Sequence, residues 1–251
     1  MAILKELHND HLKDNPARDI TLPRKTPARK VVSTTDQIRA LADKYSHYGE
    51  IVWVLATTGI RFSELAGLKV EDVDLARRRL HIERAAVTAA GSIHIGTPKT
   101  HERRSVAMPS FVCELLAPII EGKAPGDWVW CRENGEPLML PSTGSWFYEA
   151  VARLQAPKGK DAVREARWSE DRRRRAGEAR FPSVTPHGLR HAAAGLLVSS
   201  GANVKVVQRQ LGHASAAMTL DTYSALFDDD LDVVSSAMDE LVEGVGRLRA
   251  V

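Results

Sequence analysis

Residues 185–223 read TPHGLRHAAAGLLVSSGANVKVVQRQLGHASAAMTLDTY, and this stretch carries the clearest local signals in the chain. Thr185 is a favourable N-cap and Pro186 suits the first helical position, so a helix is predicted to begin here. Gly201 can adopt the left-handed conformation that ends a helix, and a second helix is predicted over residues 204–211. Apolar residues at helical spacing predict that the first helix buries one face: Leu189, Ala193, Leu196 and Leu197.

The polar residues of this stretch favour chemistry on a phosphodiester. His187 and Arg190 lie three residues apart on one face, near the helix N-terminus, where an anionic phosphate is favoured. Gly212 turns the chain after the second helix and presents His213, and Tyr223 follows on another short helical run. An arginine that binds phosphate, histidines that exchange protons and a tyrosine suit the attack of a phenolic oxygen on phosphorus.

The pattern of these residues resembles that of the tyrosine recombinases, the phage integrase family, and among them the integrases of actinobacterial phages. The family carries two further motifs that this chain matches upstream. They stand here as Thr58-Gly59-Ile60-Arg61-Phe62-Ser63-Glu64-Leu65, and as Thr97-Pro98-Lys99-Thr100 before Arg103-Arg104-Ser105-Val106. The resemblance extends from about residue 34 to residue 241. Any one motif is weak evidence, but four in this order are highly specific.

The resemblance implies a set of catalytic residues: Arg61, Lys99, His187, Arg190, His213 and Tyr223, with Glu64 in support. Two arginines can hold the non-bridging oxygens of one phosphate in a two-pronged geometry that lysine cannot copy. Tyrosine is a poor nucleophile near its ordinary pKa of about 10, so it needs a base, and His187 is its expected partner.

The remaining residues have supporting parts in this scheme. His213 is expected to donate a hydrogen bond to a phosphate oxygen in the transition state. Lys99 resembles the family's general acid, which protonates the departing 5′ oxygen from a mobile hairpin. Glu64 is expected to orient His187 or Arg61.

The implied activity is that of a site-specific recombinase, which cleaves and rejoins DNA strands through a covalent 3′-phosphotyrosine. No metal or other cofactor is required by this chemistry. The implied partners are double-stranded DNA attachment sites and further copies of the chain, as a tetramer on paired sites and a monomer alone. A cytoplasmic location is expected, at the nucleoid when DNA is bound.

Three alternatives remain open. A type IB topoisomerase shares the chemistry without partner DNA, and a DNA-binding protein need not cleave at all. His187 and His191 also have the spacing of a zinc-binding helix, with His213 as a third ligand. Gly188 stands where a zinc protease carries its catalytic glutamate, which argues against that site, and His191 is expected to pack structurally against the core.

Composition fits a globular protein in a reducing compartment. The chain has 251 residues, of which 43% are hydrophobic and 27% charged, and no apolar run approaches the roughly 20 residues of a membrane span. Its two cysteines, Cys113 and Cys131, lack metal-ligand spacing. Net charge is only +3, but residues 158–180 are dense in lysine and arginine. Within them Arg172, Arg173, Arg174 and Arg175 are candidates for contact with a DNA backbone, unless the stretch is merely a solvated helix or loop.

The predicted fold is α+β and predominantly helical, with a small three-stranded antiparallel sheet. Strands are expected over 79–84, 92–97 and 103–108, with residues 97–102 as an exposed hairpin tip. Further helices are predicted over 35–46, 48–57, 111–120, 142–155 and 229–248. Residues 1–33 are expected to be a linker and the remnant of a preceding core-binding domain, and residues 34–251 to form the catalytic domain with a C-terminal tail helix.

Overall fold

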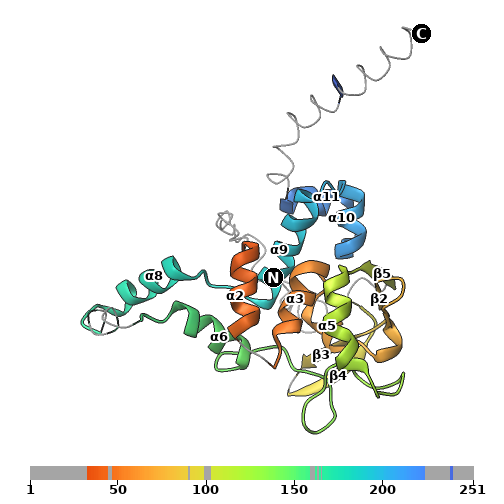
Figure 1. The fold of residues 1–251 in the computed structure, drawn as a ribbon, viewed down its shortest axis with the longest axis horizontal. Coiled ribbons are helices and arrows are strands. Elements are labelled where there is room, and N and C mark those ends of the chain that lie inside the picture. Colours follow the sequence, from red (N-terminus) through yellow and green to blue (C-terminus); the bar gives the residue numbers. More distant parts are fainter. Residues whose placement is uncertain are drawn as a thin grey trace, which may run out of the picture. The chain divides into compact units, whose positions relative to one another are not determined.

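The computed structural model of the chain describes residues 33–44, 47–89, 91–98, 103–158, 162, 164, 166–223 and 238–239. Helices predominate, as predicted, and the sheets are small (Figure 1). The helices are α2 (Thr35–Lys44), α3 (Gly49–Thr58), α4 (Phe62–Ala66), α5 (Ser110–Ile120), α6 (Trp146–Gln155), α8 (Glu170–Arg180), α9 (Pro186–Ser199), α10 (Val204–Leu211) and α11 (Ala216–Tyr223), with a 3-10 turn at Val70–Asp72. Lys99 and the helix expected over 229–248 lie outside the described residues, apart from 238–239.

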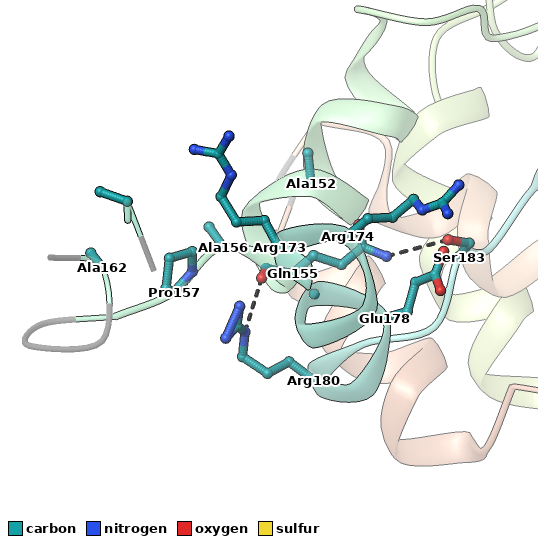
Figure 2. A pocket seen from close by; sticks show the side chains of 12 residues that line it. Ala152, Gln155, Ala156, Pro157, Ala162, Arg173, Arg174, Glu178, Arg180 and Ser183 are labelled. Carbon is teal, nitrogen blue, oxygen red and sulfur yellow. Dashed lines mark hydrogen bonds between the residues drawn. The ribbon is translucent and has the colours of Figure 1, made fainter. Parts of the chain in front are cut away.

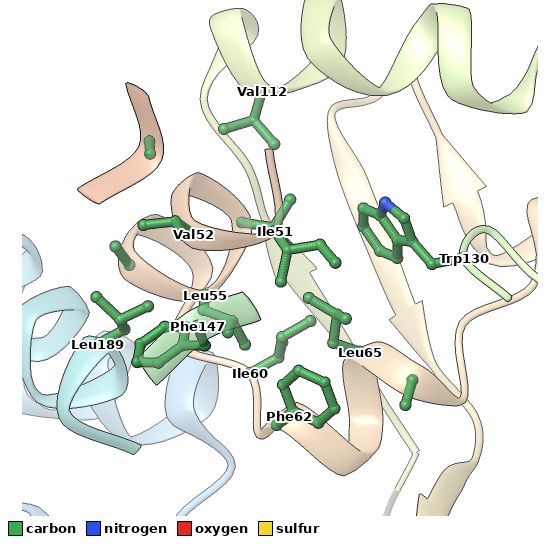
Figure 3. Packing of buried hydrophobic residues seen from close by; sticks show 14 of the residues in the cluster. Ile51, Val52, Leu55, Ile60, Phe62, Leu65, Val112, Trp130, Phe147 and Leu189 are labelled. Carbon is green, nitrogen blue, oxygen red and sulfur yellow. The ribbon is translucent and has the colours of Figure 1, made fainter. Parts of the chain in front are cut away.

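The core is built around α3, whose sequence GEIVWVLATT is apolar on almost every face. Such a helix must be surrounded by protein, and α3 packs against α2, α5 and α9. Ile51, Val52 and Leu55 are fully buried, with Phe147 and Leu189 on one side of them (Figure 3). This packing fixes the position of α9, which carries the His187-x-x-Arg190 motif, relative to the end of α3.

A small three-stranded antiparallel sheet is present, as predicted, but one of its strands differs from the prediction, and the chain also forms a separate two-stranded sheet. The three-stranded sheet has the order β1-β2-β5, from Val73–Asp74, Arg79–Ile82 and Arg104–Ala107. The strand at Ser92–Gly96, β4, pairs instead with Ala85–Ala89, β3, which was not predicted. Ala85 and Ala86 are buried and short, so their strand shows little alternation of apolar and polar residues.

The predicted hairpin tip at 97–102 is therefore wrong in its pairing. Its flanking strands are β4 and β5, which belong to different sheets, so the segment connects two sheets and does not close one hairpin. Of its residues, Thr97 and Pro98 are described, and Pro98 is buried.

The basic stretch contains a helix, α8, that lies beside α6 (Figures 1 and 2). Gly177 of α8 is buried where a side chain would contact Gln155 of α6. Two bonds tie the ends together: the Nε2 of Gln155 donates to the carbonyl of Phe181 at 3.0 Å, and the Nε of Arg180 donates to the carbonyl of Gln155 at 3.0 Å. None of the helices in the described ranges is long and apolar enough to cross a bilayer.

Candidate active site

The helix α9 begins as its sequence predicts. The Oγ1 of Thr185 accepts a hydrogen bond from the backbone N–H of Gly188 at 2.9 Å, and Pro186 occupies the first turn. His187 is exposed on this turn, whereas Arg190 is buried, with 3% of its surface exposed. An arginine is almost never buried without a partner, and the Nη1 of Arg190 donates to the carbonyl of Gly59 at 2.5 Å.

Gly59 is the point at which α3 ends and the Arg61 motif begins. It has φ +69°, and a Cβ at this position would lie 2.4 Å from Cδ2 of Leu211. Only glycine combines this left-handed conformation with such close approach. The turn directs its carbonyl to Arg190 and places Arg61 at the start of α4, so the two arginines of the predicted phosphate site are joined through two residues of backbone.

Arg61 is held by Glu64, which is almost completely buried. Its carboxylate accepts from the backbone N–H of Arg61 at 2.8 Å and from the Nη1 of Arg61 at 2.8 Å. The Arg61 side chain itself is 23% exposed. Glu64 therefore fixes the root of Arg61 and one prong of its guanidinium, which leaves the other prong available to a ligand.

Arg104 is a member of the site that the sequence reasoning missed. Its guanidinium forms a bidentate pair with Glu64, with Nη1–Oε1 at 3.0 Å and Nη2–Oε2 at 2.7 Å. The side chain is 10% exposed, and its Nε has no hydrogen-bond partner in the described part of the chain. The alternation of β5 offered the signal: Arg104 shares a face with the buried Val106, whereas the side chain of Arg103 is 77% exposed.

A cavity of about 370 Å³ brings together three predicted site residues, Arg61, His187 and Arg190. Most of its remaining lining is apolar: Ile60, Phe62, Ala86, Val87, Leu140 and Pro186, with Ser63 and Thr88. A cavity with two guanidinium groups, a histidine and a helix N-terminus on mostly apolar walls is suited to an anionic group. The structure thus places the two predicted phosphate-binding arginines on one cavity.

His213 is positioned by the junction of α10 with α3 and β5. Gln210 joins these three elements: its Nε2 donates to the carbonyls of Thr58 and Ala107 at 3.2 and 2.7 Å, and its Oε1 accepts from the N–H of Ala107 at 3.0 Å. Gly212 has φ +66°, and a Cβ there would lie 2.7 Å from the Cζ of Arg104. The residue before His213 is therefore pressed against the guanidinium that holds Glu64.

Tyr223, a buried residue, contacts His191, which was expected to pack structurally against the core. The Nδ1 of His191 lies 2.7 Å from the hydroxyl oxygen of Tyr223, and their rings meet edge to face with centroids 5.6 Å apart. On its other side His191 meets the ring of His187 at 4.8 Å, and Tyr223 stacks with His213 at 6.2 Å. Four rings thus run from the cavity to His213.

The electrostatics of the site are dominated by three guanidinium groups around one carboxylate. Burial, together with the positive charges of Arg190, Arg61 and Arg104, lowers the pKa of His213 from 6.5 to about 4, so its imidazole is neutral at pH 7. Its Nδ1 lies 2.9 Å from Oγ1 of Thr219. When that hydroxyl donates to Nδ1, the imidazole proton is on Nε2, the tautomer that can donate to a phosphate oxygen.

Two further groups have shifted proton affinities. Burial and the neighbouring guanidinium groups of Arg61 and Arg104 lower the pKa of Arg190 to about 10, with Glu64 opposing, so Arg190 remains charged at neutral pH. Burial raises the pKa of Tyr223, and the positive charge of Arg190 opposes that rise. The hydroxyl of Tyr223 therefore keeps its proton at neutral pH.

The remaining candidates lie apart from this cluster. Arg172, Arg173, Arg174 and Arg175 are exposed on α8, and two of them, Arg173 and Arg174, line a cavity of about 450 Å³ between α6 and α8 (Figure 2). No group of three His, Cys, Asp or Glu side chains is placed to hold a metal ion in the part of the chain that the structure describes. The Nδ1 of His191, a ligand in the zinc alternative, faces Tyr223 instead.

Comparison with known proteins gives concordant matches. The model of the phage integrase family matches residues 32–229. Tyrosine recombinase XerC of Mycobacterium bovis is 30% identical over 220 residues, which cover 83% of this chain and 63% of the relative, so the chain spans less than two thirds of that protein. The Tn1549 transposon integrase, solved with circular intermediate DNA, has a TM-score of 0.68 at 23% identity, with 96% of this chain and 76% of that chain covered. The XerA recombinase has a TM-score of 0.52 at 23% identity, with 88% and 70% covered.

Proposed function

Because the chain belongs to the phage integrase family, we propose that it is the catalytic part of a site-specific tyrosine recombinase that cleaves and rejoins DNA. The observation that carries this proposal is the arrangement of three groups. Arg61 and Arg190 line one cavity, and Arg190 lies on α9 next to His191, which contacts the hydroxyl of Tyr223. Transfer of a phosphoryl group to tyrosine needs a phosphate-binding pair close to a phenol, and here the phenol of α11 contacts the residue that follows Arg190 on α9.

In this mechanism the scissile phosphate enters the cavity and is held by Arg61 and Arg190. Each arginine already has one bond to the protein, to Glu64 and to the carbonyl of Gly59 respectively. Their orientation is thus fixed before the DNA binds, so little reorganisation is needed as negative charge develops on the phosphate oxygens. Phosphoryl transfer depends mainly on such positioning and charge stabilisation.

The histidines and Lys99 complete the assignment. His213, neutral at pH 7, donates from Nε2 to a phosphate oxygen, and His187 reaches the same phosphate from the cavity wall that it shares with both arginines. The oxygen of Tyr223 attacks phosphorus, forms the 3′-phosphotyrosine and releases a 5′-hydroxyl. Lys99 serves as the general acid that protonates the departing 5′ oxygen, an assignment that rests on the family resemblance of its motif.

The partners follow from the same proposal. The substrate is double-stranded DNA at attachment sites; the Tn1549 integrase, which shares the fold, was solved with circular intermediate DNA, and the XerH site-specific recombinase was solved with its difH substrate. Residues 34–251 form the catalytic domain, and residues 1–33 the linker from a preceding domain. The arginines of α8 contact the phosphate backbone, the active assembly is a tetramer on paired sites, and the protein acts in the cytoplasm.

The test is covalent capture of DNA. Duplexes with randomised half-sites and a nick beside the scissile position lose the short fragment after cleavage, so the covalent adduct accumulates and survives a denaturing gel. We expect an adduct with the native chain and none with Tyr223→Phe. Both chains should bind the duplex sequence recovered from the native adduct with similar affinity. Binding without an adduct would favour the non-cleaving alternative. Relaxation of supercoils without joining of two sites would favour the topoisomerase.

A further inference from the structure

The contact between His191 and Tyr223 indicates a catalytic role for His191 that the family motif does not assign. The motif gives His187 as the partner of the nucleophile, but the structure places the Nδ1 of His191 2.7 Å from the phenolic oxygen. Tyr223 is 4% exposed and His191 is half-buried. The contact is therefore shielded from water, which strengthens a hydrogen bond and makes it a defined route for a proton.

We propose that His191 is a further catalytic residue, which holds the hydroxyl of Tyr223 through Nδ1 and accepts its proton as the oxygen attacks phosphorus. The inference rests on the proposed function, since it concerns the nucleophile of the same reaction. It assigns His187 and His191 to different reactants. His187 faces the phosphate cavity, and His191 faces the phenol.

The proton and electron pairs balance in a single transesterification. The phenolic oxygen forms a bond to phosphorus as the bond from phosphorus to the 5′ oxygen breaks with its electron pair. The phenolic proton passes to Nδ1 of His191, which becomes a cation with its second proton on Nε2. The departing 5′ oxygen takes a proton from the general acid, proposed above to be Lys99. Rejoining reverses each transfer, so His191 returns the proton to Tyr223.

The surroundings explain why a base is needed and what makes it effective. Burial keeps the phenol protonated at neutral pH, so attack requires that the proton leave. Among the residues that the structure describes, Arg190, His187 and His213 lie next to the pair, with Arg61, Arg104 and Glu64 beyond them. Their net positive charge opposes a second cation on His191. A phosphate bound in the cavity supplies negative charge, which favours the transfer of the proton to His191.

Substitution of His191 separates proton transfer from packing. His191→Ala removes the base, and we expect adduct formation to slow by about 10² to 10⁴, the usual range for general base catalysis. His191→Asn can still hydrogen-bond the hydroxyl but cannot take its proton, so it should remain slow. His94→Ala, at an exposed histidine of β4, is the matched control and should react at the native rate. Thermal melting of each variant verifies that it is folded.

Two readouts are specific to a base on the nucleophile side. Imidazole in the buffer should restore part of the rate of His191→Ala, because it can enter the space left by the side chain. A DNA strand with sulfur in place of the 5′ bridging oxygen has a leaving group that needs no proton, and His191→Ala should stay slow on it. A defect that disappears on the sulfur substrate would overturn the proposal, since His191 would then serve the leaving group.

Three further outcomes would contradict the proposed role of His191 or the proposed function. Equal rates for the native chain and His191→Ala would show that the tyrosine needs no help from His191. A native rate for His191→Asn would reduce the role to a hydrogen bond and exclude proton transfer. Absence of any adduct with the native chain would overturn the proposed function itself, and is distinguished from failure of this inference by the native control.

Discussion

The carboxylate of Glu64 and the guanidinium of Arg104 form two hydrogen bonds, of 3.0 and 2.7 Å, in the interior of the molecule. The pair joins α4 to β5, and its Arg104 guanidinium is in close contact with Gly212, the residue before His213. Burial raises the pKa of Glu64, but the bonds and charges of Arg104 and Arg61 outweigh it and hold that pKa below 4.5. Since Arg104 satisfies most of the carboxylate, Arg61 is attached by one prong only.

Arg104→Met should therefore damage both stability and cleavage. Glu64 would lose its bidentate partner in a buried position, a change that typically costs about 3 to 5 kcal/mol. Arg61 would then turn fully onto Glu64 and away from the phosphate, so we expect slower adduct formation even with saturating DNA. Arg103→Met, one residue away with a side chain 77% exposed, should change the free energy of unfolding by less than about 0.5 kcal/mol. Urea titration and single-turnover rates measure the two effects.

A double variant separates the two effects of Arg104. Glu64→Met with Arg104→Met removes both charges, and replacing a buried pair by apolar groups is often nearly neutral for stability. Cleavage should remain slow, because Arg61 would have no carboxylate to orient it. Recovery of both stability and rate in the double variant would contradict a positioning role for this network.

Gly59→Ala should lower the stability of the fold by more than the loss of a left-handed glycine alone would cost. The left-handed conformation costs a non-glycine residue about 1 to 2 kcal/mol, and the new Cβ would also collide with Leu211. Gly135→Ala is the matched control, since Gly135 has φ +80° with no atom near its Cβ position. We expect a clearly lower melting temperature for Gly59→Ala than for Gly135→Ala. Equal losses would mean that α10 can move away from the end of α3 without cost.

Acidification should destabilise the DNA-free protein in a window set by His213. The folded pKa of about 4 lies below the ordinary 6.5, so the unfolded chain binds more protons between these values. The contribution of neutral His213 is complete above pH 6.5 and is lost as pH falls toward 4. Glu64, whose folded pKa lies below 4.5, adds its loss at lower pH. Melting temperature measured against pH should fall less steeply from 6.5 to 4.5 in His213→Gln. Identical slopes would argue that His213 is solvated.

Features of the fold that depend on interactions within a few residues could be predicted from the sequence, whereas features that depend on distant residues could not. Helix α9 was predicted with its cap because Thr185, Pro186 and the apolar spacing act within a few residues. The pairing of β4 was wrong because strand partners are chosen by contacts distant in sequence, and the short residues of β3 give little alternation.

The site was predictable in its membership but not in its contacts. Motifs named Arg61, His187 and Arg190, and the structure brings these onto one cavity. The motifs carry no information on which histidine contacts Tyr223, because that depends on where α11 lies relative to α9. Arg104 could have been found from its inward position in β5, but its partner Glu64 is 40 residues away in the chain.

Chelation should leave cleavage unchanged. In the proposed mechanism Arg61, Arg190 and His213 supply the charge stabilisation that a metal ion supplies in many phosphoryl-transfer enzymes. We expect the same single-turnover rate of adduct formation with excess EDTA as without it. A loss of activity that added zinc restores would support the histidine metal site, and restoration by magnesium would point to a role for acidic residues.

The exposed arginines of α8 should contribute to DNA affinity and not to the chemical step. Arg173 and Arg174 extend from α8 beside α6 (Figure 2). Arg174 also forms an ion pair with Asp171, with Nη2 3.1 Å from Oδ1. Each phosphate contact releases counterions and adds about 0.9 to the slope of log affinity against log salt. Arg173→Gln should therefore weaken binding and reduce that slope by roughly one. Arg174→Gln should reduce it by less, because Arg174 already has an ion-pair partner.

Arg77→Gln, with a side chain 85% exposed, controls for the loss of one charge. At saturating DNA all three variants should cleave at the native rate. An unchanged salt slope in Arg173→Gln would assign this face of α8 to solvent.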